Sequence, residues 1–240
     1  MRVIVCDNYD EMSEKCAQLI AGTVHLKPDC VLGLATGSTP IGAYDKLVEL
    51  YNNGKIDFSN VTTFNLDEYY PLAPDNDQSY RYFMNEHLFN KVNIPIENTN
   101  VINGLAEDPE AECAAFDAKI ATTSGIDLQL LGVGINGHIG FNEPDDALIA
   151  DTHITDLTKS TIEANSRFFN DISEVPTKAL TMGIASILRS KKIVILASGK
   201  NKHNAVTEML NNEIKTSVPA TMLKVHPDVV LICDKDAYNG

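Results

Sequence analysis

The segment from Gly134 to Pro144 carries the residues of this chain that are best suited to acid–base chemistry. It contains His138, and Glu143 follows five residues later. Histidine can donate and accept a proton near neutral pH, because its unperturbed pKa lies in that range. Closely spaced glycines such as Gly134 and Gly137 allow the backbone to approach a ligand and to adopt a positive φ. We therefore expect a substrate-binding loop here, although a glycine turn with a structural histidine has the same short pattern.

Asp67 is a second candidate for acid–base chemistry. It follows a mixed apolar run at 61–66 and precedes Glu68, Tyr69 and Tyr70. A strand that ends at this point would deliver the carboxylate to a crevice, and the aromatic neighbours would raise its pKa toward that of a general base. The alternative is a plain turn, in which an isolated Asp-Glu pair is common.

Two further loops have the features of small anion sites. Gly37, Ser38 and Thr39 lead into a helical pattern that begins near residue 41, where free N–H groups and the helix dipole attract an anion. The loop at 198–202 repeats this arrangement and adds two lysines, Lys200 and Lys202. The first loop is neither a Walker A sequence nor a dinucleotide fingerprint, so we expect it to bind a monophosphate. The alternatives are a Ser/Thr helix cap for the first loop and a solvated lysine for the second.

The elements that must position these residues alternate between strand and helix patterns. Near-continuous apolar runs, typical of strands covered on both faces, occur at residues 3–6, 30–35, 128–133, 193–197 and 229–233, with a more mixed run at 61–66. Helical patterns lie between them at 41–53, 109–122 and 202–211. This alternation predicts an α/β fold with a doubly wound, Rossmann-like and mainly parallel sheet that has helices on both faces. The carboxyl ends of parallel strands share one edge, so we expect the polar segments that follow four of the runs to meet around one crevice.

Length, charge and cysteine content narrow the possible classes of protein. The 240 residues contain no linker-like tract, and we expect one domain that spans residues 1–240. The formal net charge of -14 disfavours nucleic acid and anionic membranes as partners, and no apolar stretch approaches the length of a membrane span. The N-terminus has no signal-peptide pattern, so we expect a cytoplasmic protein. The five cysteines include no C-x-x-C pair, which predicts reduced core thiols and no metal site.

Three motifs together resemble the glucosamine-6-phosphate deaminase family. They are Asn65 to Tyr69, Gly132 to Pro144 and Ala164 to Phe169, in the order typical of that family. The resemblance implies a Rossmann-like fold that works without a metal or an organic cofactor. It also implies conversion of D-glucosamine 6-phosphate and water to D-fructose 6-phosphate and ammonia. That reaction consists of ring opening, transfer of a proton from C2 to C1 through an enolamine, and loss of the amine.

The resemblance also assigns roles to individual residues. Asp67 would be the base that moves the proton, and His138 would open the pyranose ring, with Glu143 orienting and charging it. The phosphate would lie against Ser38, Thr39, Arg167 and Lys202. For Arg167 the alternative is an ordinary surface arginine. Asn136 stands where many family members carry an aspartate, so we expect His138 to be less readily protonated than in those members.

Two other functions stay open on the sequence alone. A 6-phosphogluconolactonase would have a similar fold and a related Gly-His loop. Such enzymes usually have Asp-Glu-Arg where this chain has Asp-Glu-Tyr at 67–69, and they lack the Phe-Asn-Glu-Pro run at 141–144. A non-catalytic sugar-phosphate sensor would keep the anion loops, but the intact Asp67, His138 and Glu143 argue against it. No residue decides between the glucosamine and galactosamine epimers.

Longer members of the family bind an activator, N-acetylglucosamine 6-phosphate, through a C-terminal extension and basic residues after the Asn-Glu-Pro motif. This chain has Asp145, Asp146 and Asp151 after that motif, and these carboxylates would repel a phosphate. The chain resembles a short form without the extension. We therefore expect hyperbolic kinetics and a monomer, with a dimer as the second possibility.

Overall fold

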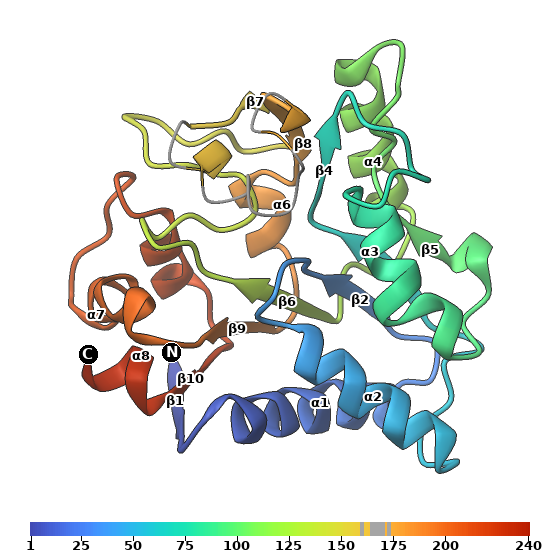
Figure 1. The fold of residues 1–240 in the computed structure, drawn as a ribbon, viewed down its shortest axis with the longest axis horizontal. Coiled ribbons are helices and arrows are strands. Elements are labelled where there is room, and N and C mark those ends of the chain that lie inside the picture. The colour runs from blue at the N-terminus through green and yellow to red at the C-terminus, as the bar shows by residue number, and fades with distance from the viewer. Residues whose placement is uncertain (159–160, 164–170, 172–173) are drawn as a thin grey trace.

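A parallel sheet of seven strands runs through the centre of the protein (Figure 1). The computed structural model describes residues 1–158, 161–163, 171 and 174–240. The strand order is β1-β10-β9-β6-β2-β3-β5, and every neighbouring pair is parallel. The strands are β1 (Arg2–Cys6), β2 (Val31–Leu34), β3 (Thr62–Asn65), β5 (Thr99–Asn100), β6 (Leu128–Gly132), β9 (Ile193–Ala197) and β10 (Val229–Asp234). The sheet grows in one direction from β2 and in the other from β6, so the doubly wound fold predicted from the sequence is confirmed.

Helices cover both sides of this sheet. In Figure 1, α1 and α2 lie below the sheet and α6 lies above it. All residues of β9 and β10 are buried, which explains why these strands are continuous apolar runs instead of alternating ones. The helices include α1 (Tyr9–Leu26), α2 (Ile41–Asn52), α3 (Tyr80–His87), α4 (Pro109–Ala121), α6 (Ile184–Leu188), α7 (His203–Leu210) and α8 (Lys235–Asn239). Short 3₁₀ helices occur at Phe89–Lys91, Ile96–Asn98, Lys200–Lys202 and Pro219–Val225.

Several helices begin where the sequence supplies a capping side chain. Asn8, Ser79 and Asp108 accept hydrogen bonds from backbone N–H groups in the first turns of α1, α3 and α4. Such a cap satisfies a donor that has no partner within the helix. The residues at the cap positions of α2 and α7 make no such bond. These two helices follow the two loops that the sequence marks as anion sites.

A second, antiparallel sheet was not predicted from the sequence. It has three strands in the order β4-β8-β7, namely β4 (Asp67–Tyr70), β8 (Lys178–Thr181) and β7 (His153–Asp156). Leu66 alone separates β3 from β4 and joins the two sheets. Its N–H donates to the carbonyl of Leu34 at 3.1 Å, and its carbonyl accepts from the N–H of Met182 at 2.7 Å. Asp67 therefore begins a strand of the second sheet and does not end a strand of the first, because the chain continues in extended form past Leu66.

The buried apolar residues form a large cluster around the parallel sheet and a small one beside the second sheet. All five cysteines are buried free thiols, as the sequence predicts. Among the described residues, no helix combines the length and the apolar character that crossing a membrane requires. The described part of the chain also contains no group of three or more Cys, His, Asp or Glu residues arranged to hold a metal ion.

Candidate active site

The four polar segments marked by the sequence follow strands that lie side by side, in the order β9-β6-β2-β3. Because these strands are parallel, their carboxyl ends share one edge and the loops that follow them emerge together. This edge includes the point between β2 and β6 where the direction of the sheet reverses. In folds of this kind, ligands usually bind at such a point.

The loop after β6 holds the ring of His138 against the backbone of Gly134. The N–H of Gly134 donates to the carbonyl of His138 at 2.9 Å, and the N–H of Gly137 donates to the carbonyl of Gly134 at 3.0 Å. A Cβ atom at position 134 would lie 2.4 Å from Cε1 and Nε2 of His138, so a larger residue there would displace the imidazole ring. Gly137 has a φ of +84°, a backbone conformation that side chains disfavour. Both glycines are needed to set the position of the histidine.

A buried carboxylate faces His138. Nδ1 of His138 lies 3.2 Å from Oε1 of Glu143, and the side chain of the glutamate is 8% exposed against 24% for the histidine. The amide of Asn136 donates to Oε2 of Glu143 at 2.7 Å and accepts from the N–H of His138 at 3.2 Å. This arrangement leaves Nε2 as the ring nitrogen that can exchange a proton with a ligand.

Glu143 is anionic throughout the neutral pH range. Burial on its own raises its pKa, but the adjacent His138, with hydrogen bonds from Thr161 and Asn136, outweighs burial and lowers the pKa to about 2. The hydroxyl of Thr161 reaches Oε1 from the segment between β7 and β8. Thr161 was not predicted from the sequence, and no local pattern marks it, because it lies 18 residues from Glu143 in the chain.

The amide at position 136 suits this arrangement. An aspartate there would place a second carboxylate in the contact that Asn136 now makes with Glu143 at 2.7 Å. Two carboxylates at that separation would have to share a proton. Asn136 avoids this repulsion by donating a hydrogen bond, and it leaves Glu143 as the carboxylate beside His138.

Asp67 lies beside the loop that carries His138. It is 6% exposed and pairs with Thr181 of β8. A Cβ atom at Gly140 would lie 3.5 Å from Oδ2 of Asp67 and 2.9 Å from Oγ1 of Thr181, so the loop approaches both closely. The hydroxyl of Thr181 also accepts a hydrogen bond from the N–H of Phe141 at 3.0 Å. Thr181 therefore connects β4, which carries Asp67, to the loop that carries His138.

Two neighbouring carboxyls in β4 are both buried. Burial and, secondarily, the charge of Glu68 raise the pKa of Asp67 to about 8. Burial also raises the pKa of Glu68 to about 7, although its carboxylate accepts backbone N–H bonds from Tyr69 and Tyr80 at 2.9 Å and from Arg81 at 3.0 Å. These bonds hold the start of α3 against β4. This role of Glu68 was not predicted from the sequence.

Aromatic side chains pack beside these carboxyls. The ring of Tyr80 lies nearly parallel to that of Phe141, with centroids 6.1 Å apart. Tyr69 contacts both rings, at 4.8 Å from Tyr80 and 5.8 Å from Phe141. Burial raises the pKa of Tyr69 to about 12, so its hydroxyl is neutral. The sequence predicts aromatic residues beside Asp67, and Tyr69 is one of them. The structure adds Tyr80 from α3 and Phe141 from the loop after β6.

The loop after β2 presents Ser38 and Thr39 at the start of α2. Gly37 has a φ of +88°, which turns the chain from the strand toward the helix. The hydroxyl of Tyr9 donates to the carbonyl of Ser38 at 3.1 Å and accepts from the N–H of Gly42 at 2.8 Å. The cap position is a proline and not Ser38 or Thr39, so the alternative interpretation of these residues as a helix cap is wrong.

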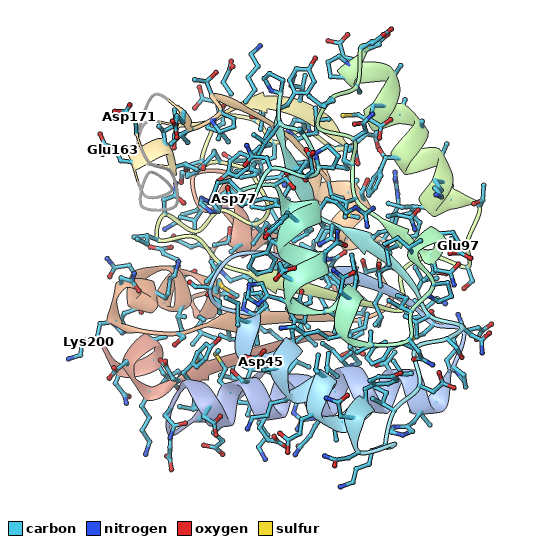
Figure 2. The ribbon with its side chains drawn as sticks, turned by 45° about the vertical axis from the view of Figure 1, so that its right-hand side comes forward. Asp45, Asp77, Glu97, Glu163, Asp171 and Lys200 are labelled. Atoms are coloured by element: carbon cyan, nitrogen blue, oxygen red, sulfur yellow. The ribbon has the colours of Figure 1, made fainter. Side chains whose placement is uncertain are left out.

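The loop after β9 is anchored by Asp234 at the end of β10. This carboxylate accepts hydrogen bonds from the hydroxyl of Ser198 at 2.5 Å and from the N–H of Gly199 at 3.0 and 3.1 Å. These two donors are therefore already used within the protein. Lys200 projects from the surface (Figure 2). Lys202, in contrast, is half-buried at the start of α7.

Arg167, the remaining predicted phosphate ligand, lies outside the described residues, together with the rest of the motif at 164–169. Of the predicted phosphate ligands, the structure describes Ser38, Thr39 and Lys202. They lie on the loops after β2 and β9, which are separated in the sheet by β6 alone. The loop that carries His138 follows β6, so it emerges between them.

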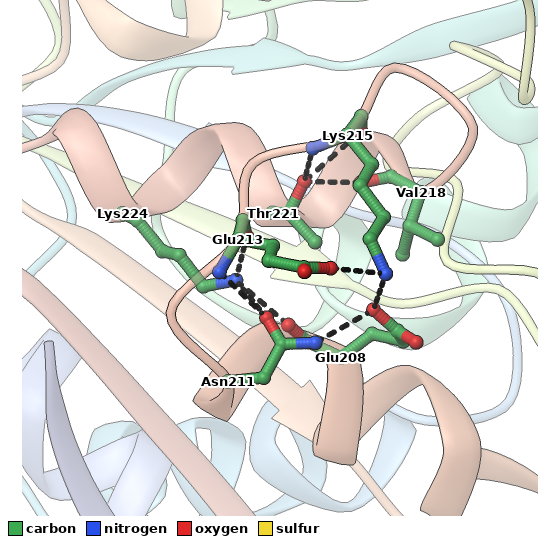
Figure 3. A network of polar contacts seen from close by, with 7 residues as sticks. All are labelled: Glu208, Asn211, Glu213, Lys215, Val218, Thr221 and Lys224. Carbon is green, nitrogen blue, oxygen red and sulfur yellow. Dashed lines mark hydrogen bonds and ion pairs between the residues drawn. The ribbon is translucent and has the colours of Figure 1, made fainter.

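A network of polar contacts from the end of α7 and the segment after it supports the loop that carries His138 (Figure 3). A Cβ atom at Gly137 would lie 2.4 Å from Cγ1 of Val218, and the N–H of Ala220 donates to the carbonyl of Gly137 at 2.8 Å. The hydroxyl of Thr221 holds this turn closed by accepting from the N–H of Lys215 at 2.8 Å. The other members of the network are Glu208, Asn211, Glu213 and Lys224. The sequence did not predict this network, because its polar residues form no motif that would distinguish them from other surface residues.

Comparisons with known proteins place the chain in a family. Residues 7–231 match the family described as glucosamine-6-phosphate isomerases/6-phosphogluconolactonase. The chain belongs to this family. A glucosamine-6-phosphate deaminase of Clostridium perfringens is 57% identical over 237 residues, which cover 99% of this chain and 98% of the relative.

Solved structures of the family have the same fold. A monomeric glucosamine-6-phosphate deaminase has a TM-score of 0.97 and 44% identity, and the match covers 100% of this chain and 99% of the other. A 6-phosphogluconolactonase from Thermotoga maritima has a TM-score of 0.76 and 25% identity, with 98% of this chain and 99% of the other covered. Solved proteins named for each of the two activities of the family therefore share the fold of this chain.

The substitution Asp67→Asn should stabilise the folded protein increasingly as the pH rises. The pKa of Asp67 is about 8 in the folded protein and 3.8 in an ordinary environment, so between these values the folded protein binds a proton that the unfolded chain has lost. Wild-type stability therefore falls with rising pH over this range, and the variant is free of that loss. At about pH 9 we expect the free energy of unfolding of the variant to exceed that of the wild type by at least about 1 kcal/mol. One unit of pKa shift corresponds to about 1.4 kcal/mol, so this expectation uses only a small part of the shift of Asp67.

Urea unfolding of both proteins at about pH 5 and about pH 9 checks this expectation. Other titrating groups are common to the two proteins, so the difference between them isolates Asp67. A difference that does not grow with pH would contradict the burial argument.

Proposed function

We propose that this chain is an enzyme that converts D-glucosamine 6-phosphate and water to D-fructose 6-phosphate and ammonia. The observation that carries the proposal is the combination of a buried Asp67, whose pKa is raised to about 8, with a His138–Glu143 pair on the adjoining loop. Deaminase relatives that are 56% and 57% identical over 99% of this chain support the same reaction.

In this proposal Asp67 is the base. Transfer of a proton from C2 to C1 needs one base on one face of the open chain, because the same carboxylate can remove and return the proton. A carboxyl whose pKa is about 8 holds the proton well between the two steps.

His138 opens the sugar ring. Ring opening requires a group that donates a proton to the ring oxygen and accepts one from the C1 hydroxyl near neutral pH, which suits an imidazole. With Nδ1 facing Oε1 of Glu143, Nε2 is the atom that makes these transfers. Asn136 donates to the other oxygen of Glu143 and so holds the carboxylate beside the histidine.

The phosphate lies against the edge loops. We assign its contacts to Ser38, Thr39, Lys202 and Arg167, the last of which lies outside the described residues. The start of α2 contributes backbone N–H groups and the positive end of its dipole. Binding the phosphate far from C1 and C2 uses remote contacts to position the reacting carbons.

Release of ammonia from glucosamine 6-phosphate is the direct test of the proposed function. A 6-phosphogluconolactonase would instead hydrolyse its lactone and leave the amino sugar unchanged, and a sensor would bind without turnover. Galactosamine 6-phosphate, assayed in parallel, decides the epimer. No release of ammonia from either sugar would refute the proposal.

Asp67→Asn should abolish exchange of the C2 proton and retain sugar-phosphate binding. The amide keeps the shape of the side chain but cannot accept the proton. We would follow deuterium incorporation from solvent at C2 by NMR and binding by calorimetry. Asp236→Asn, an exposed carboxylate in the first turn of α8, is the matched control and should behave like the wild type. Exchange at the wild-type rate in Asp67→Asn would place the base elsewhere.

Lys202→Ala should raise KM for glucosamine 6-phosphate about tenfold or more and weaken discrimination against unphosphorylated glucosamine. A charge-assisted hydrogen bond to phosphate contributes about 1.5 to 3 kcal/mol. Lys200→Ala removes an exposed lysine from the same loop and serves as the control, with little change expected. If the two substitutions change KM equally, Lys202 is a solvated lysine and does not bind the phosphate.

We further propose that the enzyme is a monomer with hyperbolic kinetics and no response to N-acetylglucosamine 6-phosphate. The similarity to a monomeric deaminase at a TM-score of 0.97 supports the monomer. An anionic effector needs cations to bind, and the segment after Glu143 offers Asp145, Asp146 and Asp151 instead. Light scattering and substrate titrations with and without the effector measure both properties. A Hill coefficient well above one that falls when the effector is added would overturn this expectation.

A further inference from the structure

Thr161 reaches the catalytic histidine through a shared oxygen. Its hydroxyl donates to Oε1 of Glu143, and the same Oε1 lies 3.2 Å from Nδ1 of His138. Thr161 is 6% exposed, and it lies after β7 where the described residues 161–163 are helical. A side chain from a distant part of the chain therefore completes the surroundings of the carboxylate that orients the histidine.

The orientation of the hydroxyl is set by its neighbours. The hydroxyl of Thr158 donates to Oγ1 of Thr161 at 3.0 Å, and the N–H of Thr161 donates back to Oγ1 of Thr158 at 3.3 Å. Since Thr161 accepts from Thr158, its own proton is directed to Glu143. The amide of Asn136 donates to Oε2 of the same carboxylate at 2.7 Å, so each oxygen of Glu143 accepts a hydrogen bond from a different side chain.

We propose that Thr161 is a positioning residue for ring opening, which holds Oε1 of Glu143 opposite Nδ1 of His138. This inference rests on the proposed function of His138. With Oε1 fixed, the proton of the ring stays on Nδ1, and Nε2 keeps the orientation that exchange with the ring oxygen of the sugar requires. The hydrogen bonds to Glu143 are then formed before the substrate binds, so the side chains around the carboxylate need not rearrange during the proton transfer.

Packing alone does not account for the hydroxyl. Ile162, the next residue, packs against the small apolar cluster that contains Tyr69, Phe141 and Leu157. The turn is therefore anchored by an apolar neighbour, whereas the hydroxyl of Thr161 is directed at Glu143. A substitution that keeps the shape of Thr161 and removes its donor separates the two contributions.

Thr161→Val and Thr161→Ser make that separation. Valine keeps the β-branched shape without a donor, and serine keeps the donor with a smaller side chain. We expect kcat for ammonia release to fall about tenfold or more in Thr161→Val with KM changed less than about twofold, and Thr161→Ser to retain most of the wild-type kcat. An equal loss of kcat in both variants, or an effect on KM alone, would overturn the inference.

A double-mutant cycle with Glu143→Gln tests the path. If Thr161 acts through Glu143, adding Thr161→Val to Glu143→Gln should change kcat by less than about twofold. Effects that simply multiply would show that Thr161 acts independently of the carboxylate and would overturn the proposal.

Nitrogen-15 NMR of His138, without substrate, distinguishes failure of this inference from failure of the proposed function. The resonances are assigned by their loss in His138→Gln. In the wild type we expect the proton of the neutral ring on Nδ1, and in Thr161→Val we expect this preference to weaken because Oε1 is no longer fixed, with Thr161→Ser unchanged. An unchanged pattern in Thr161→Val refutes the positioning role. A wild-type protein that releases no ammonia refutes the proposed function and leaves this measurement valid.

Discussion

The hydrogen bonds of Leu66 are the constraint on which the geometry of the site depends. One residue pairs with Leu34 in the parallel sheet through its N–H and with Met182 beyond the second sheet through its carbonyl. The chain therefore passes from β3 into β4 without a turn, and Asp67 is the first residue after the crossing. A loop at this point would have left the carboxylate mobile and solvated. An extended backbone with both partners satisfied holds it buried instead.

The two carboxyls of the site have opposite electrostatic environments. Glu143 lies beside His138 and accepts hydrogen bonds from Asn136 and Thr161, and these neighbours together lower its pKa to about 2 despite burial. Asp67 is buried next to another carboxyl, Glu68, and its pKa is raised to about 8. One group is thus a permanent anion that can orient a histidine, and the other can gain and lose a proton near neutral pH. Pairs of titratable groups with such divergent pKa values are typical of acid–base enzymes.

The loop after β6, which carries His138, depends on backbone contacts from several directions. Its glycines allow His138 to lie on Gly134 and allow Val218 to pack on Gly137. The turn that carries Val218 is itself held by the polar network around Lys215, Thr221 and Lys224 (Figure 3). On the other side, Thr181 binds the N–H of Phe141 from β8. Rigid support of this kind keeps a side chain within the small tolerances that proton transfer requires.

The sequence by itself determined the parallel sheet, the edge where its loops meet, and the residue types suited to acid–base chemistry there. These features follow from continuous apolar runs and from glycines and polar residues placed directly after them, which are local properties. Only the tertiary structure showed that Asp67 begins a second sheet, that Glu68 caps α3, and that Thr161 binds Glu143. Each of these depends on a partner far away in the chain, and such contacts leave no periodicity in the sequence. The shifted pKa values of Asp67 and Glu143 also depend on the tertiary structure, because burial and the contacts with neighbouring charges arise only when the chain folds.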